Sequence, residues 1–261
     1  MDTRTELNQM AAQFLRQLEE RGESFLLLED VNLADYPGTQ VDELKTDIAS
    51  GEAPAASVSG TRPGESLEEF GARIASCTGC ILHESRTNFV FGAGDHGADM
   101  LFIGEGPGAE EDRQGLPFVG RSGQLLTKII ASIGFTREEI YIANMVKCRP
   151  PGNRDPRPDE ISACNGHLLG QLDLIKPKVI VTLGRFSAGY FHGSPGAAMR
   201  DMRGQVGEFH GVKVVSTYHP AALLRNPNWK RGCWEDMLLA RKVYDQEGGR
   251  TSRGEVYRPG G

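Results

Sequence analysis

Hydrophobic residues between positions 67 and 247 fall into two alternating patterns. Short continuous apolar runs, which are typical of strands buried on both faces of a sheet, cover residues 99–103, 140–145, 178–183 and 212–217. Apolar residues at helical spacing fill stretches between these runs, at residues 122–133, 158–175, 185–191 and 233–246. Because strands and helices alternate, the sequence predicts an α/β fold whose parallel sheet carries helices on both faces.

The first 66 residues have a different pattern. Residues 5–22 place apolar side chains on one helical face, at Leu7, Met10, Ala11, Phe14, Leu15 and Leu18. The stretch that follows is acidic, and residues 51–66 are rich in Ala, Gly, Ser and Pro, as in a flexible linker. We therefore expect three parts: an acidic, partly helical N-terminal extension with its linker (1–66), a globular domain (67–247) and a disordered tail (248–261).

The formal net charge of -6 is unevenly distributed along the chain. Residues 1–70 carry 5 Lys and Arg against 15 Asp and Glu, whereas the remaining residues carry 24 against 20. A mildly basic domain behind an acidic extension is compatible with a polyanionic partner. An ordinary mixed surface explains the charge of the domain equally well.

The five cysteines are best interpreted together with the cellular compartment. No apolar run approaches the roughly 18 residues that a membrane-spanning helix requires, and the N-terminus lacks the pattern of a signal peptide. We therefore expect a cytoplasmic protein without a membrane partner. Cysteines in that compartment argue against a disulfide framework and for metal binding or catalysis.

Four of the cysteines have a spacing that suits a metal site. Cys77 and Cys80 form a two-ligand clip, Cys148 follows the second predicted strand, and Cys164 lies in the helix after it. Four thiolates can hold either Zn²⁺ or an iron–sulfur cluster, and spacing alone does not choose between them. The plain alternative is that these are buried structural thiols, which is how we interpret Cys233 beside Trp234.

A glycine-rich turn follows the first predicted strand. Residues 100–103 run directly into Gly104, Gly106 and Gly108, which let the backbone turn tightly and approach a ligand. An acidic cluster follows the turn, at Glu110, Glu111 and Asp112. Sites in α/β folds lie beyond the carboxyl ends of the strands. The turn also fits a dinucleotide fingerprint loosely, but the second strand that should end in an acidic residue about 20 positions later is missing.

Other polar residues fall at the same predicted edge of the sheet. Asn144 ends the second strand, where its amide can contact both a donor and an acceptor on a base edge. His219 follows the fourth strand, and a neutral imidazole can donate to an oxygen that gains negative charge. Phe118 can stack on a planar ligand, although the local sequence favours a core position. A turn residue and a capping histidine are the plain alternatives for the first two.

The loop after the second strand is basic and rich in proline. It contains Arg149, Arg154 and Arg157. A rigid, exposed, basic loop suits contact with phosphates. A solvated loop is the plain alternative.

Several long motifs, in order, resemble the bacterial and archaeal family 4 uracil-DNA glycosylases. They span residues 104–112, 115–123, 144–153 and 219–227. The four-cysteine pattern is similar to the iron–sulfur ligand set of that family, including the 15-residue gap between Cys148 and Cys164. The resemblance covers about residues 70–245.

This resemblance implies a three-layer αβα sandwich around a central parallel four-stranded sheet. It implies hydrolysis of the N-glycosidic bond of deoxyuridine in DNA, which leaves an abasic site. It also implies a [4Fe–4S] cluster on Cys77, Cys80, Cys148 and Cys164. We expect a monomer that acts on uracil-containing DNA and contacts a protein partner through residues 1–66.

The resemblance also assigns roles to single residues. Glu105 and Gly106 would line the uracil pocket, Phe118 would stack on the flipped base, and Asn144 would contact the uracil edge. His219 would donate to uracil O2 as the base leaves. The DNA would meet Arg149, Arg154 and Arg225.

The water-activating residue is less clearly assigned. Other families of these glycosylases carry an Asp where this chain has Gly106, so Glu105 and Glu111 are our candidates for positioning water. A branch that stays covalently attached to uracil DNA has a His in the basic loop, which this chain lacks, so we expect turnover without an adduct. The alternative function is a non-catalytic iron–sulfur module that binds DNA beside a polymerase or a repair complex.

Overall fold

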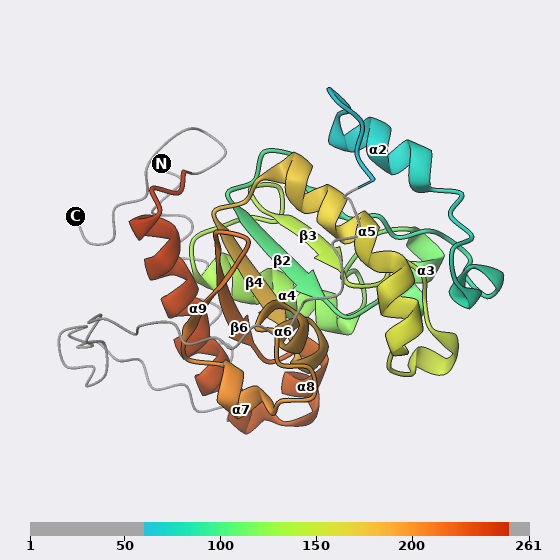
Figure 1. The fold of residues 1–261 in the computed structure, drawn as a ribbon. Helices are drawn as coiled ribbons and strands as arrows, with labels where there is room; N and C mark the ends of the chain where they lie inside the picture. Colours follow the sequence, from blue (N-terminus) through green and yellow to red (C-terminus); the bar gives the residue numbers. More distant parts are fainter. Residues whose placement is uncertain (1–59, 251–261) are drawn as a thin grey trace, which may run out of the picture. The chain divides into compact units, whose positions relative to one another are not determined.

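The sheet is built from the four apolar runs that the sequence predicts as strands. The computed structural model describes residues 60–250 (Figure 1). Within them, β2 (Met100–Gly104), β3 (Tyr141–Asn144), β4 (Val179–Leu183) and β6 (Val212–Thr217) run parallel to one another. Their side chains are almost all buried, as expected of parallel strands with helices on both sides.

Two further strands extend the sheet, so the expectation of four strands is wrong in number. β1 (Ala93–Gly94) and β5 (Val206–Phe209) pair antiparallel at opposite edges, in the order β1-β3-β2-β4-β6-β5. β5 alternates between exposed and half-buried residues, and β1 has only two residues. Neither edge strand is a continuous apolar run, which is why the hydrophobic pattern did not predict them.

One face of the sheet packs against α4 (Arg121–Ser132) and α9 (Lys230–Gln246). Met100 and Phe102 of β2 point to this side, because alternate residues of a strand face opposite ways. The helices contribute buried side chains to the same cluster, among them Leu126, Ile130, Met237, Ala240 and Tyr244. α8 (Pro220–Arg225) follows β6 on this side and contributes Leu223.

The other face packs against α5 (Pro158–Ile175) and α6 (Arg185–Phe191). Leu101 and Ile103 of β2 point to this side, with Leu168 of α5 and Phe191 of α6 in the same cluster. Helices therefore cover both faces of the mixed sheet, and Figure 1 shows the sheet between them.

The predicted helices agree with the observed ones to within three residues, as α4, α5, α6 and α9 show. Three short helices were not predicted: α2 (Leu67–Ile74), α3 (Ala109–Gln114) and α7 (Met199–Met202). The remaining elements are 3₁₀ turns, η2 (Ile81–Glu84), η3 (Pro151–Asn153) and η4 (Pro227–Trp229). α2 begins with a capping box in which Ser66 and Glu69 bond to each other's backbone.

Parts of the sequence predictions lie outside the described residues. The predicted leader helix at 5–22, most of the linker and residues 251–261 are among these, so the N-terminal extension and the tail stay predictions. Arg250 is described, and its backbone N–H donates to Asp99 Oδ2 at 2.8 Å. None of the helices within residues 60–250 has the length and hydrophobicity needed to cross a membrane.

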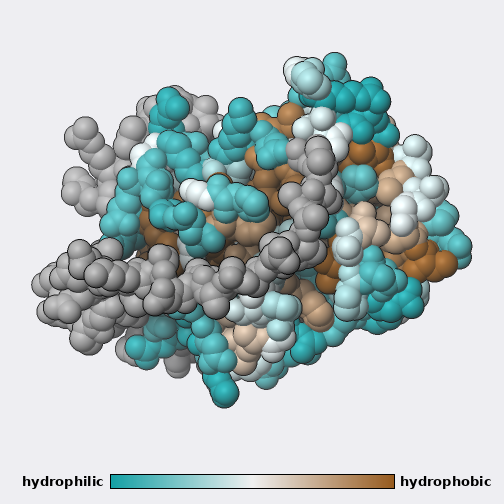
Figure 2. Space-filling model, viewed as in Figure 1, coloured by the Kyte–Doolittle hydropathy of each residue, from teal (hydrophilic) through white to brown (hydrophobic). Residues whose placement is uncertain are grey.

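Polar side chains cover most of the described surface in the view of Figure 2, and hydrophobic residues gather there in smaller areas. The most exposed large apolar side chains lie in several separate elements, at Ile81, Leu116, Val206, Leu224, Trp229, Trp234 and Leu238. Single apolar residues on a surface are normal for a soluble domain.

Candidate active site and cysteine pocket

Strand ends bring three of the predicted site residues together. Gly104 ends β2 and is paired in register with Asn144, which ends β3. A Cβ atom built on Gly104 would lie 2.5 Å from Asn144 Oδ1 and 2.5 Å from Phe118 Cζ, so only glycine fits there. The rings of Phe118 and His219 are 5.5 Å apart between centroids. The carboxyl edge of the sheet thus gathers an amide, an aromatic ring and an imidazole.

The Asn144 side chain has an unsatisfied polar atom. Asn144 is 1% exposed, and its Oδ1 has no hydrogen-bond partner within residues 60–250. Leaving a buried acceptor unpaired costs about 1–3 kcal/mol. Such an atom in a cluster of conformationally restricted residues points to a ligand that supplies the missing donor.

The His219 ring is held as a neutral donor. Its Nδ1 accepts a hydrogen bond from the Ala221 N–H at 3.2 Å and caps α8. Burial, with a smaller contribution from the charge of Arg225, lowers the pKa of His219 to about 4, and Glu111 opposes this shift. A neutral imidazole whose Nδ1 accepts carries its proton on Nε2, so this ring can donate at neutral pH.

Phe118 is held in a strained backbone conformation. Its φ is 52°, in the left-handed region that bulky residues rarely adopt. The residue is 5% exposed and belongs to the apolar cluster on the α4 face. Phe118 therefore occupies a core position, as its local sequence favours, and its ring also lies beside His219.

The Glu111 carboxylate holds the loop that carries Phe118. Its Oε1 accepts hydrogen bonds from the backbone N–H groups of Val119 and Gly120, both at 2.9 Å. Glu111 is buried, and its other oxygen lies toward Gly108. The observed contacts are to backbone, and the water-positioning role that the sequence suggests stays a prediction.

Glu105 stands at the carboxyl end of β2 with a perturbed acidity. Burial, with a smaller contribution from the charge of nearby Asp155, raises the pKa of Glu105 to about 7, and Arg185 opposes this rise. Arg185 Nη2 in turn pairs with Asp155 Oδ2 at 2.6 Å. A carboxyl group that changes charge near neutral pH at the mouth of a site is a candidate for proton transfer.

Gly106 is enclosed by its neighbours. A Cβ atom there would lie 2.8 Å from Val146 Cγ2. An Asp at position 106, as in other glycosylase families, would therefore require Val146 to move. The departure from those families has a packing reason in this chain.

The predicted DNA-contacting arginines differ in their surroundings. Arg154 donates two hydrogen bonds to the buried carboxylate of Glu160, at 2.8 and 2.6 Å, and this contact holds the pKa of Glu160 at about 2. Arg149 Nε donates to Asn153 Oδ1 at 2.7 Å. Arg225 is exposed at the last position of α8. The ion pair of Arg154 was not predicted, because it depends on the fold of the loop.

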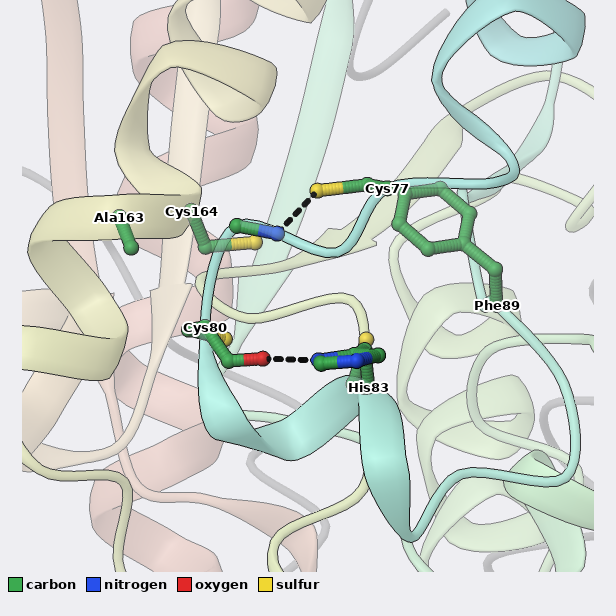
Figure 3. A pocket seen from close by; sticks show the side chains of 8 residues that line it. Cys77, Cys80, His83, Phe89, Ala163 and Cys164 are labelled. Atoms are coloured by element: carbon green, nitrogen blue, oxygen red, sulfur yellow. Dashed lines mark hydrogen bonds between the residues drawn. The ribbon is translucent and has the colours of Figure 1, made fainter.

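The four predicted ligand cysteines line one pocket (Figure 3). Cys77 and Cys80 come from the segment between α2 and η2, Cys148 from the loop after β3, and Cys164 from α5. All four are free thiols. Cys233 lies elsewhere, buried in the cluster under α9, as the sequence analysis expected.

Hydrogen-bond donors approach the sulfur atoms of this pocket. Arg86 Nη1 donates to Cys148 Sγ at 3.1 Å, and His167 Nε2 lies 3.1 Å from Cys77 Sγ. Donors of this kind stabilise thiolates and orient metal ligands. No three His, Cys, Asp or Glu side chains within the described part of the chain are arranged to hold a single metal ion.

A buried lysine connects the two sites and was not predicted. Lys147 is 0% exposed, and its ammonium donates to the Asn144 carbonyl oxygen at 2.8 Å and to Gln171 Oε1 at 2.5 Å. Burial lowers the pKa of Lys147 to about 8. The residue thus ties the end of β3 to α5.

Comparisons with known proteins find uracil-DNA glycosylases among the relatives of this chain. A profile of the "Uracil DNA glycosylase superfamily" matches residues 91–238. A "Type-4 uracil-DNA glycosylase" of Thermotoga maritima is 43% identical over 187 residues, which are 70% of this chain and 97% of the relative. Proteins of the same name from Archaeoglobus fulgidus (46% identical; 62% of this chain, 85% of the relative) and Sulfurisphaera tokodaii (44%; 69% and 85%) also match.

The chain therefore belongs to the uracil DNA glycosylase superfamily. Within that superfamily, the chain belongs to the type-4 uracil-DNA glycosylases. The resemblance in the motifs is confirmed over the described domain.

Proposed function

We propose that this protein removes uracil from DNA by hydrolysing the N-glycosidic bond of deoxyuridine, as a first step of base excision repair. Membership of the type-4 uracil-DNA glycosylases supports this activity. The observation that carries the assignment to this site is the unpaired Oδ1 of Asn144, buried beside Phe118 and His219.

Recognition would depend on Asn144 and Phe118. The uracil base must leave the DNA stack before an enzyme reaches its glycosidic bond. Asn144 Oδ1 then accepts from the N3–H of uracil, a donor that cytosine lacks at this position. A site built to pair with a polar group rejects an analogue without it, because the buried atom stays unpaired. The Phe118 ring would stack on the face of the bound base.

Bond cleavage would depend on His219. As the bond between C1′ and N1 breaks, its electron pair moves into the uracil ring and charge grows on O2. The Nε2–H of neutral His219 donates to O2 and stabilises this anion. Water then attacks C1′ of the cationic sugar and loses a proton, which completes the hydrolysis.

Glu105 is the better of our two candidates for receiving that proton. Its pKa of about 7 lets it ionise at neutral pH, and it directly follows Gly104 at the carboxyl end of β2. The contacts of Glu111 are to the backbone of Val119 and Gly120, which suits positioning of the Phe118 loop.

The cysteine pocket would hold a [4Fe–4S] cluster on Cys77, Cys80, Cys148 and Cys164. Four free thiols that line one pocket, with donors at two of the sulfurs, support this ligand set. When bound, such a cluster cross-links the segment before η2, the loop after β3 and helix α5. These residues position the loop that begins at Cys148, and none of them takes part in bond cleavage.

The DNA backbone would meet Arg149, Arg154 and Arg225. Their charges would act through phosphate contacts, which give affinity without sequence preference. We also propose that the protein acts as a monomer in the cytoplasm and that residues 1–66 contact a protein partner.

The direct test is excision from a labelled oligonucleotide that contains one deoxyuridine. The strand should break after alkali treatment, whereas matched oligonucleotides with thymine or cytosine at that position should stay intact. The reaction should leave no protein–DNA adduct that survives denaturation. Intact uracil DNA with protein that retains its visible cluster absorbance would instead favour the non-catalytic binding module.

A further inference from the structure

The conformation of Phe118 has to be maintained by its surroundings. Its left-handed backbone (φ 52°) is unfavourable for a bulky residue, and strain of this kind persists only where neighbouring groups fix it. Gly123 gives the loop room, because a Cβ atom there would lie 1.9 Å from the Phe118 carbonyl oxygen. Specific donors or acceptors must then hold the loop in place.

Arg137 supplies two of the contacts that fix this loop. Its guanidinium donates from Nη2 to the Pro117 carbonyl oxygen at 2.8 Å and from Nη1 to the Phe118 carbonyl oxygen at 3.0 Å. Nη1 also lies 3.4 Å from Thr127 Oγ1 of α4. Arg137 stands before β3, outside every motif in the sequence that resembles the family.

The loop is therefore held from two sides. Arg137 donates hydrogen bonds to its carbonyl groups, whereas Glu111 accepts hydrogen bonds from the N–H groups of Val119 and Gly120. A planar guanidinium can bind two adjacent carbonyls at once, which a lysine ammonium on its flexible stem does poorly. Both sets of contacts are made with Phe118 in its left-handed conformation.

We propose that Arg137 is a positioning residue of the glycosylase, which acts on uracil through Phe118. This inference rests on the proposed function. The Phe118 ring is packed against the Gly104 backbone and lies beside His219. Without the two carbonyl contacts, Phe118 relaxes toward a negative φ and its ring leaves the place where the base stacks. The charge of Arg137 is not itself part of the contact with DNA.

The test is a double-mutant cycle between Arg137 and Phe118, measured as single-turnover excision from uracil DNA. Arg137→Ala should lower the rate by about 5- to 150-fold, the range expected for loss of base stacking. In a Phe118→Ala background the same change should cost no more than about twofold, because the residue it acts through is gone. An unchanged rate in the single variant, or the full loss in both backgrounds, would overturn the proposal.

Two matched variants separate positioning from charge. Arg137→Lys keeps the positive charge but loses the two-point contact, so it should lose most of the rate that Arg137→Ala loses. Arg113→Ala removes an exposed arginine that pairs only with Glu110 on the surface, and it should react at the wild-type rate. A wild-type rate in Arg137→Lys, with a reduced salt dependence in Arg137→Ala, would assign Arg137 to phosphate contact instead.

A further measurement does not depend on uracil chemistry. Amide hydrogen exchange at Val119 and Gly120 should accelerate in Arg137→Ala and in Arg137→Lys, while exchange in β2 and β4 stays slow. If the wild-type protein excised no uracil, the proposed function would fail, and this measurement would still report on the loop contacts. Unchanged exchange at both residues would remove Arg137 as the group that holds the loop.

Discussion

Residues 144–148 contribute both to the candidate base site, formed by Asn144, Phe118 and His219, and to the cysteine pocket, but the polar atoms of the two regions are satisfied differently. At the candidate base site, Arg137 and Glu111 fix the loop backbone, and Asn144 Oδ1 has no hydrogen-bond partner within residues 60–250. In the cysteine pocket, donors from Arg86 and His167 already approach sulfur atoms.

This difference suits the first region to recognition of the substrate and the cysteine pocket to support of the fold. An unpaired acceptor inside a rigid frame gains most when a matching ligand arrives, so changes there should affect the reaction. The cysteine sulfurs already have hydrogen-bond donors and come from three segments that are distant in the sequence. Changes to these cysteines should therefore affect folding and metal content. Lys147 lies between the two regions and bonds to the backbone of Asn144.

After Asn144, the largest expected effect is at His219. Replacement by Ala should lower single-turnover excision about 10²- to 10³-fold, as loss of one donor to a developing anion does elsewhere. Iron content should not change. His210→Asn is the matched control, since His210 is exposed in the turn between β5 and β6, and Asn tolerates its φ of 50°. A loss of iron in the His219 variant would break the separation between the two regions.

The next effect concerns Glu105 and pH. Its carboxyl group is protonated below its pKa of about 7 and ionised above it, and only the ionised form can accept a proton from water. Excision should therefore rise about tenfold per pH unit well below that value and level off above it. Glu105→Gln should lower the rate and flatten the profile.

Glu110→Gln controls for the pH measurement, because Glu110 is exposed on α3 and pairs with Arg113. Its profile should match that of the wild-type protein. The pKa of His219, about 4, lies well below that of an ordinary histidine. His219 should therefore add no inflection to the profile of excision rate against pH between pH 6 and 8. A slope that persists in Glu105→Gln would assign the proton transfer to another group.

A smaller effect on the reaction is expected at the cysteines. Cys164→Ala should lose iron and visible absorbance, and its unfolding midpoint should fall by more than about 5 °C because a cross-link between segments is lost. Excision by the protein that remains folded should fall less than in the His219 variant. Cys233→Ala is the control: its sulfur is buried under α9, and its iron content should be unchanged. Full iron content in Cys164→Ala would remove this residue from the ligand set.

The smallest effect is expected at Arg225. Its exposed side chain would contact phosphate, so Arg225→Ala should reduce the slope of log affinity against log salt by about 1 and weaken binding to all sequences alike. Arg200→Ala, on the exposed surface of α7, should leave the slope unchanged. A change in base preference in the Arg225 variant would contradict a role limited to phosphate contact.

Much of the fold could be predicted because buried parallel strands are continuous apolar runs. β2, β3, β4 and β6 have this pattern, and the residues at their carboxyl ends were expected to meet. The edge strands were missed, because short strands with one exposed side lack a distinctive pattern.

The parts of the site that sequence did not predict are contacts between side chains and distant backbone. The pairing of Arg137 with the Phe118 loop spans 19 positions along the chain, and the pairing of Arg154 with Glu160 depends on a folded loop. Residue type gives no signal for either contact. The burial of Lys147 is equally hidden, because lysine is ordinarily an exposed residue.

The central claim is that the unpaired acceptor of Asn144 is reserved for the edge of uracil. The most direct measurement is single-turnover excision by Asn144→Ala, with iron content and the unfolding midpoint determined on the same sample. We predict a loss of about 10³-fold or more in rate, since the base loses its polar contact, with iron and midpoint as in the wild-type protein. A wild-type rate in a folded, iron-loaded Asn144→Ala protein would contradict the account.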